Sequence, residues 1–313
     1  MSLINNYQSL IDKGLSPIEF MRIFSDADEC LDLYFNLKYS GKDCPKCGRN
    51  ITQNYVRISR PNKNGTPKKA YRCRSCHTFI YPMANSIFRQ STIPLPAIFD
   101  VLFMMCSARS SMSAIDVTTQ IGISYKTAHK LMMLIRVILY SAPRIKMKGI
   151  LEVDEAFLGT GSKIYNWSGI STRKQPIIGI IERDTKKVRV FLVQNRKAVT
   201  IEKLVEDNIE KGSTIYTDSW RGYNGLSSNY THESVDHSKR EFVRGDVHTN
   251  AIENFWGQVK RNLRKAHIKI SDKYVHLYLN EAAWRHNSKG RKSMELFNEV
   301  LISSFSVFDC TIT

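Results

Sequence analysis

The chain has 313 residues, and its 46 Lys and Arg against 29 Asp and Glu give a formal net charge of +17. A soluble domain needs a net charge of only roughly 2–8, so this surplus indicates a polyanionic partner, most commonly nucleic acid. The apolar stretches are far shorter than the ~20 residues of a membrane helix, and no basic flank precedes an apolar run at the N-terminus. These features exclude a membrane-spanning chain and predict a cytoplasmic protein. No basic amphipathic helix supports the alternative of a membrane-surface protein.

The length suggests two or three domains. Residues 1–40 are predicted to form a segment of short helices that serves as packing scaffold. Ser16 and Glu19 have the spacing of a capping box, with Pro17 at the first helical position. Apolar residues then recur at helical spacing at Cys30, Leu33, Tyr34 and Leu37.

Residues 41–82 contain two CxxC pairs, Cys44 with Cys47 and Cys73 with Cys76, separated by 25 residues. Two such pairs can complete a tetrahedral shell around one structural Zn²⁺, and strand-like runs between them predict a zinc ribbon. Four unrelated thiols or a redox CxxC are the alternatives, but a redox motif calls for a βαβ setting that this segment lacks. His77 is expected to be a neighbour rather than a ligand. The remaining cysteines, Cys30, Cys106 and Cys310, are expected to be ordinary buried thiols.

Residues 94–140 are predicted to be a helical DNA-binding region. Its second half has the spacing of a helix-turn-helix, with helices at 113–121 and 125–136 around a turn at Gly122 and with Ser124 as a cap. An ordinary helical hairpin is the alternative. Polar and basic side chains in the first two turns of the second helix are candidates for DNA contact: Tyr125, Lys126, Thr127, His129 and Lys130.

A basic linker over 141–149 precedes a change of pattern. Ile- and Val-rich runs predict strands at 150–157, 176–182, 187–193 and 214–217, with a helix at 200–210 and further helices from residue 250. This order predicts an α/β domain with a mixed sheet over 150–290. Residues 291–313 are predicted to form a C-terminal helical tail.

Three acids occupy informative positions in that domain. Asp154 lies within its first strand, Asp218 directly follows another strand, and Glu253 opens a helix. Acids placed in this way can converge on one point, and phosphodiester hydrolysis uses two metal ions roughly 3.5–4 Å apart. Carboxylate oxygens suit Mg²⁺ or Mn²⁺.

Four motifs together resemble the DDE transposases of bacterial insertion sequences, in particular the branch with an N-terminal zinc ribbon and helix-turn-helix. These are the cysteine pairs, Val153-Asp154-Glu155, Tyr216-Thr217-Asp218, and the segment from His248 through Lys260. The 34 residues between Asp218 and Glu253 fit the same pattern. The resemblance covers about residues 15–290. It implies a ribonuclease-H-like catalytic domain in which Asp154, Asp218 and Glu253 hold two divalent ions.

Some assignments stay open within this resemblance. Glu152 shares a strand face with Asp154 and is an alternative ligand, Asp246 is a further candidate, and Glu155 should face the other way. The segment 158–175, expected to be a loop, is less basic and less glycine-rich than in similar proteins, and its contacts with DNA stay open.

The helix that carries Glu253 offers candidate DNA contacts. His248 and Asn250 are candidates for bonding a ligand carboxylate or a phosphate, with helix capping by Thr249 or Asn250 as the alternative. Trp220 and Tyr223 are candidates for stacking on a base. Phosphate contacts are expected farther along this helix from Lys260, Arg261, Arg264 and Lys265.

The resemblance implies that the protein binds the ends of a mobile DNA element, cuts them and joins the 3′-hydroxyl to target DNA. Double-stranded DNA is then the partner, and a dimer or larger assembly is expected because two ends must meet. A non-catalytic DNA-binding regulator would lack one of the three acids. A structure-specific nuclease of the same fold would cut without joining.

Overall fold

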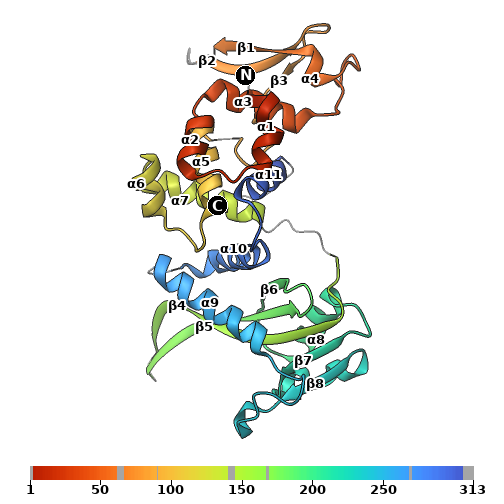
Figure 1. Ribbon diagram of the computed structural model, residues 1–313. Helices are drawn as coiled ribbons and strands as arrows, with labels where there is room; N and C mark the ends of the chain where they lie inside the picture. The colour runs from red at the N-terminus through yellow and green to blue at the C-terminus, as the bar shows by residue number, and fades with distance from the viewer. Residues whose placement is uncertain are drawn as a thin grey trace. The chain divides into compact units, whose positions relative to one another are not determined.

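The computed structural model describes residues 3–61, 67–89, 91–139, 145–166, 169–267 and 270–305. The chain packs into two compact units (Figure 1). The first comprises Met1–Ala108, Ala114–Ile138 and Gly290–Thr313, and the second comprises Arg109–Ser113 and Leu139–Lys289. Within the described ranges, no helix combines the length and apolar character needed to cross a membrane.

The first unit is a helical bundle that carries a small three-stranded sheet. Its helices are α1 (Leu3–Asp12), α2 (Pro17–Ile23), α3 (Ala27–Tyr39), α4 (Ile51–Asn54), α5 (Leu95–Ser107), α6 (Ala114–Ile121), α7 (Tyr125–Leu139) and α11 (Ser293–Ser303). Its strands are β1 (Tyr55–Pro61), β2 (Pro67–Cys73) and β3 (Phe79–Ile80), antiparallel in the order β1-β2-β3. The predicted capping box is confirmed at the start of α2, where Ser16 and Glu19 bond each other's backbone N–H.

An aromatic cluster forms the centre of this bundle and includes a residue from the far end of the chain. Phe20 stacks on Phe24 and Phe103 with ring centroids 4.2 and 4.0 Å apart, and Phe297 of α11 meets Phe20 at 4.9 Å. Tyr7 of α1 also donates a hydrogen bond to Asn298 of α11. Aromatic pairs of this kind add about 0.5–1.5 kcal/mol each beyond their buried area. The predicted C-terminal tail is therefore part of the core of the first unit.

The small sheet is fixed to α3 by aromatic and ionic contacts. The ring of Phe35 stacks on that of Tyr71, with centroids 3.8 Å apart. Arg57 of β1 lies 3.1 Å from a carboxylate oxygen of Asp32 and 3.4 Å from one of Asp28. The hairpin predicted between the cysteine pairs thus rests on the first helices, which act as its support.

The second unit is built on a five-stranded mixed sheet in the order β6-β5-β4-β7-β8. Strands β4 (Ile150–Asn166), β5 (Gly169–Glu182) and β6 (Val188–Leu192) are antiparallel neighbours, whereas β7 (Thr214–Asp218) and β8 (Thr231–Val235) run parallel to β4. The mixed sheet predicted from sequence is confirmed. Strand β8 was not predicted, because Thr231–Val235 alternates only weakly in polarity.

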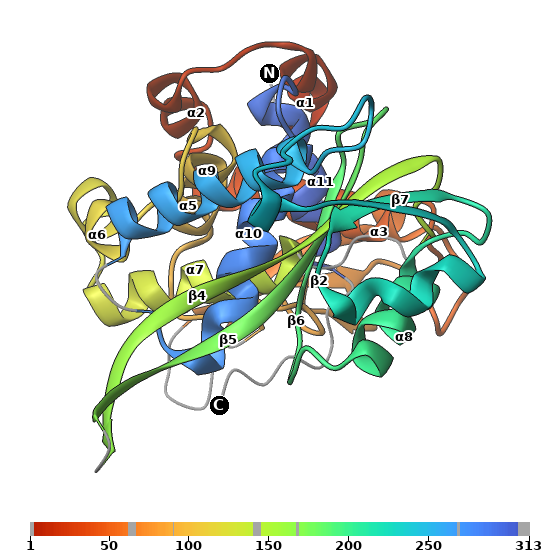
Figure 2. The same cartoon turned by 90° about the horizontal axis from the view of Figure 1, so that it is seen from below.

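Strands β4 and β5 are longer than predicted and form the long hairpin seen in Figure 2. Pairing continues to Asn166 and Gly169, so the prediction of a loop over 158–175 is wrong for the described backbone. Side chains from 158 to 175 are outside the described residues, and so are residues 141–144 of the predicted linker and Cys310. The predicted DNA contacts of that segment therefore stay open.

Helices cover both faces of the larger sheet (Figures 1 and 2). On one face, α8 (Ala198–Asn208) and the 3₁₀ turn η1 (Arg221–Ser228) pack on the apolar side chains of β4, β5 and β7. On the other lies α9 (Asn250–Ala266), which packs closely because a Cβ at Gly179 of β5 would come within 2.5 Å of the Trp256 ring. The remaining elements are η2 (His237–Lys239), η3 (Asp272–Tyr274) and α10 (Val275–Asn287).

Candidate functional site

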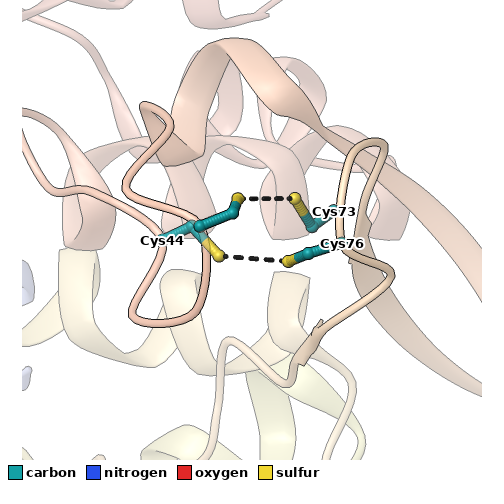
Figure 3. A group of neighbouring side chains, drawn as sticks. Cys44, Cys73 and Cys76 are labelled. Carbon is teal, nitrogen blue, oxygen red and sulfur yellow. Dashed lines mark hydrogen bonds between the residues drawn. The ribbon is translucent and has the colours of Figure 1, made fainter.

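The four ribbon cysteines converge on one point. The sulfur atoms of Cys44, Cys47, Cys73 and Cys76 all lie within 4.8 Å of one another. The sulfur of Cys44 lies 3.6 Å from that of Cys76, and the sulfur of Cys47 lies 3.7 Å from that of Cys73. Figure 3 shows Cys73 and Cys76 on one loop, facing Cys44 on the other. Four thiolates at ~2.3 Å from a tetrahedral Zn²⁺ are about 3.8 Å apart. The spacing of the sulfur atoms therefore fits a closed Zn²⁺ site.

Hydrogen-bond donors surround this sulfur cluster. The hydroxyl of Tyr55 donates to the sulfur of Cys44 at 3.1 Å, and the amide of Asn54 donates to that of Cys73 at 3.1 Å. The Tyr55 hydrogen bond is the main cause that lowers the pKa of Cys44 to about 6. Because the thiolate is the form that binds metal, the hydrogen bond from Tyr55 favours ion binding at Cys44. His77 is outside the group, as predicted.

A second ligand group lies in the larger sheet, where oxygens of Asp154, Glu155 and Asp218 lie within 4.8 Å of one another. The sheet explains how they meet. Pairing between β4 and β7 ends at Glu152 opposite Tyr216, two residues before Asp154 and Asp218. The two parallel strands separate beyond this pair, and ligand sites commonly form at the carboxyl ends of such strands.

The electrostatics of this acidic group favour a cation. Burial raises the pKa of Asp154 to about 8, and the negative charges of Glu155, Asp218 and Glu253 add to the rise. Burial also raises the pKa of Asp218. Like charges held close together make each other's ionised form costly, and a divalent cation relieves that cost. Hard oxygen donors of this type fit Mg²⁺ or Mn²⁺.

Glu155 was not expected in this group. Its side chain does lie on the α8 face of the sheet, where it accepts hydrogen bonds from Tyr223 at 2.6 Å and Arg196 at 2.9 Å. Its carboxylate nevertheless reaches Asp154 and Asp218 where the pairing of β4 with β7 has ended. Glu155 thus faces the other way along the strand, as predicted, but its carboxylate belongs to the acidic group, which strand alternation did not predict.

Glu253 lies close enough for its charge to act on Asp154, but it is outside the tight group of ligand atoms. One of its oxygens accepts a hydrogen bond of 2.6 Å from Thr249 and lies 3.3 Å from Nε2 of His237. The side chain is 47% exposed. The structure thus brings Asp154 and Asp218 together, with Glu253 at the edge of the same cluster.

Comparison with known proteins identifies this domain. Residues 146–287 match the family model described as the ISXO2-like transposase domain. A transposase-like protein of Haemophilus influenzae is 33% identical over 108 residues, which cover 34% of this chain and 86% of that protein. The chain belongs to the insertion-sequence transposases. It is also similar to a protein in the transposable element ISH50 of Halobacterium salinarum, with 26% identity over 74% of this chain and 83% of the relative.

The two other acids considered as ligands, Glu152 and Asp246, form hydrogen bonds with other groups of the protein. The carboxylate of Glu152 is fully buried and accepts hydrogen bonds from the backbone N–H of Ala251 and Ile252 and from Arg183. Asp246 is exposed and accepts a bond from Arg183 through its carbonyl.

The start of α9 differs from the prediction. Thr249 occupies the N-cap position without capping through its side chain, and its hydroxyl bonds Glu253 instead. His248 accepts a hydrogen bond from Arg183 at Nδ1, whereas Asn250 is exposed. Side-chain capping by Thr249 is therefore wrong, and DNA contact by His248 and Asn250 stays a prediction.

The aromatic residues after Asp218 are less available than predicted. Tyr223 is fully buried with its hydroxyl on Glu155, so it cannot stack on a base. Trp220 is half-buried, and the guanidinium of Arg196 lies over its ring at 4.9 Å. No sequence motif signalled Arg196, because it lies between elements.

Basic residues predicted to contact DNA lie on exposed helix faces. In the second unit, Arg261, Arg264 and Lys265 of α9 are exposed and Lys260 is partly buried. In the first unit, Gly122 takes the positive φ of +75° that turns the chain between α6 and α7, and the Ser124 side chain accepts from the N–H of Thr127, which confirms the predicted cap. Tyr125, Lys126 and Lys130 are exposed, and Thr127 and His129 are partly buried.

Proposed function

We propose that this protein is an active transposase that cuts the ends of its DNA element and joins the freed 3′-hydroxyl to target DNA. The observation that carries the proposal is the meeting of Asp154 and Asp218 where β4 and β7 separate, inside the matched transposase domain. The strand order β6-β5-β4-β7-β8, with the first three strands antiparallel, supports a ribonuclease-H-like fold.

Asp154, Asp218 and Glu253 are proposed to hold two divalent ions, Mg²⁺ or Mn²⁺. A pair of such ions supplies activation of the attacking oxygen and stabilisation of the leaving oxygen in an in-line displacement. A bound cation would favour the ionised form of Asp154, because its raised pKa arises from burial and neighbouring negative charge. The same residues serve cutting and joining, since both steps are displacements at phosphorus.

Glu253 is preferred to Glu155 as the third ligand because of their existing partners. Glu155 is held by Tyr223 and Arg196 with little exposure, 8% of its side chain. Glu253 is about half exposed and bonded through one oxygen, so it can turn toward the other acids. Glu155 then adds negative charge beside the ions and keeps Arg196 near the site.

The first unit is proposed to bind the element ends. The cysteine cluster, with one structural Zn²⁺, fixes the ribbon. Helix α7 presents Tyr125, Lys126 and Lys130, with Thr127 and His129 as further contacts, in the manner of a recognition helix. The basic face of α9 adds phosphate contacts from Lys260, Arg261 and Arg264. Two DNA ends must be held at once, so a dimer or larger assembly in the DNA complex is part of the proposal.

The test uses a labelled duplex of an element end with a target duplex and Mg²⁺. Asp154→Asn, Asp218→Asn and Glu253→Gln should each lower cleavage and joining by ~100-fold or more, because a metal misplaced by about 1 Å costs that much. End binding in gel-shift assays should persist. Asp207→Asn, an exposed acid on α8, is the matched control and should cleave like wild type.

Three outcomes would change the proposal. Normal cleavage by Glu253→Gln with loss of cleavage by Glu155→Gln would move the third ligand to Glu155. Cleavage without joining by the wild type would indicate a nuclease. Binding with neither reaction would indicate a DNA-binding regulator.

A further inference from the structure

Glu152 has an unusual environment for an acid that lies two residues from a proposed metal ligand. Its side chain is completely buried. One oxygen accepts hydrogen bonds from the backbone N–H of Ala251 at 2.8 Å and Ile252 at 3.0 Å. The other accepts from Nε of Arg183 at 2.8 Å and lies 3.4 Å from Nδ1 of His248. A buried carboxylate with this many donors is held in one position.

Arg183 extends this arrangement to the loop before α9. Its two terminal nitrogens donate to the carbonyl of Asp246 at 2.7 Å and to the carbonyl of His248 at 2.8 Å. Its guanidinium lies 4.6 Å from the ring centre of Tyr216 on β7. We call Glu152, Arg183 and the groups that they bond the Glu152–Arg183 clasp. The clasp joins β4, β7, the end of β5 and the start of α9.

The clasp also explains the missing cap on α9. The first N–H groups of a helix need acceptors, and the N-cap side chain usually supplies one. Here Glu152 accepts from the second and third residues of the helix, Ala251 and Ile252, while the hydroxyl of the N-cap residue Thr249 bonds Glu253. Because Glu152 of β4 caps the helix, the hydroxyl of Thr249 is available to bond Glu253 and orient it.

The clasp is placed to control the metal site. Glu152 lies two residues before Asp154 on the same strand face, and the helix N–H groups that it bonds belong to the two residues directly before Glu253. We propose that Glu152 is a positioning residue that sets the distance between Asp154 and Glu253 by fixing the first turn of α9 to β4. This inference rests on the proposed function, because it assumes that both acids hold the metal ions.

A simple structural role is the competing explanation, since any buried ion pair lost on one side destabilises a fold. The second unit offers a matched control. Glu281 on α10 is also fully buried and pairs with Arg285 at 2.8 Å. Glu281→Gln removes the same charge from a comparable ion pair away from the acidic group, so it reports on stability alone.

The experiment measures three quantities on the full chain: the melting temperature, amide hydrogen exchange over 250–256, and the dissociation constant for Mn²⁺ at the carboxylate site. Glu152→Gln should speed exchange at Ala251 and Ile252 and weaken Mn²⁺ binding by ~10–100-fold, the range for groups that orient metal ligands. Glu281→Gln should lower the melting temperature but change Mn²⁺ binding less than about twofold.

Arg183→Lys keeps the positive charge beside Glu152 and loses the forked contacts with Asp246 and His248. It should give an intermediate loss of Mn²⁺ affinity, and it supplies the measurement if Glu152→Gln does not fold. Combining the two substitutions should cost less than the sum of the single losses, because both act through one contact.

The proposal is overturned if the clasp variants bind Mn²⁺ like wild type, or if Glu281→Gln weakens Mn²⁺ binding as much as they do. Failure of the proposed function gives a different result. In that case the wild-type protein itself would show no Mn²⁺-dependent cleavage and no saturable Mn²⁺ binding lost in Asp154→Asn.

Discussion

The two ligand clusters of this protein contrast in how the chain builds them. The sulfur cluster comes from two short loops joined by one hairpin, and all four ligand atoms lie within 4.8 Å of one another. The carboxylate cluster comes from β4, β7 and α9, and Glu253 stands at its edge. A closed shell of soft ligands suits an ion that stabilises a fold, whereas an open group of hard ligands suits an ion that must meet a substrate.

Because of this difference, substitutions in the two clusters are expected to change the stability of the protein in opposite directions. Removing a ligand from the sulfur cluster removes a cross-link of the fold. Removing an acid from the carboxylate cluster removes repulsion among buried charges. Functional sites of natural proteins retain such charge repulsion at a cost in stability, because the function needs the charged groups.

The largest effect is expected at the ribbon. Cys44→Ser should abolish Zn²⁺ binding and unfold residues 41–82, because structural Zn²⁺ contributes on the order of 10–16 kcal/mol to such folds. Metal analysis should give about one Zn²⁺ per wild-type chain, and limited proteolysis should cut the variant within this segment. Cys106→Ser, which changes a buried cysteine of α5 outside the cluster, is the control. A Zn²⁺-free wild-type protein with an intact ribbon would contradict the assignment.

In buffer without Mg²⁺ or Mn²⁺, Asp154→Asn is expected to raise the stability of the protein, whereas Cys44→Ser lowers it. The pKa of Asp154 in the folded chain is about 8, raised by burial and by neighbouring acids from its usual value of 3.8. Its favourable contribution is therefore complete below pH ~4 and is lost as the pH rises through 8. The stability of the asparagine variant does not fall in this way, since its side chain carries no charge.

We therefore expect Asp154→Asn to be more stable than wild type at pH 9 and equal to it near pH 4, with ~6 kcal/mol as the upper bound, since the pKa rises from 3.8 to about 8 and each pKa unit corresponds to ~1.4 kcal/mol. Thermal melting across this pH range measures the difference. Asp207→Asn should melt like wild type throughout. A variant less stable than wild type at pH 9 would show that Asp154 makes a favourable contact when charged.

A smaller effect is expected from Tyr55→Phe, which removes only the hydroxyl that donates to Cys44. Without this bond the pKa of the Cys44 thiol should return toward its usual value, and Zn²⁺ affinity at pH 7 should fall by ~10-fold. Competition with a Zn²⁺ chelator measures the change. Tyr81→Phe is the control, because Tyr81 lies after the second knuckle and outside the cluster. An unchanged Zn²⁺ affinity would indicate that the Tyr55 side chain acts only in packing.

The smallest effect concerns DNA binding by α7. Lys126→Ala and Lys130→Ala should each weaken binding to all sequences and reduce the slope of log affinity against log salt by about one, because each removes one phosphate contact. Tyr125, Thr127 and His129 are the candidates for reading bases. Lys203→Ala on α8 is an exposed control. Equal slopes for all variants would make α6 and α7 an ordinary helical hairpin.

The sequence alone predicted the features that depend on local spacing. The two CxxC pairs, the capping box at Ser16 and Glu19, the turn at Gly122 and the apolar strands all follow from neighbours along the chain. The position of Asp154 within one strand and of Asp218 directly after another also predicted that the two acids meet, and the structure brings them together.

The tertiary structure alone decided what depends on distant contacts. Phe297 completes the core of the first unit from the other end of the chain, and Glu155 joins the acids because β4 and β7 separate beyond Glu152. Glu152 itself looked like an alternative ligand, yet it bonds the first turn of α9, 99 and 100 residues away. Strand periodicity fixes the face on which a side chain lies, but which group meets it there depends on how separate elements pack.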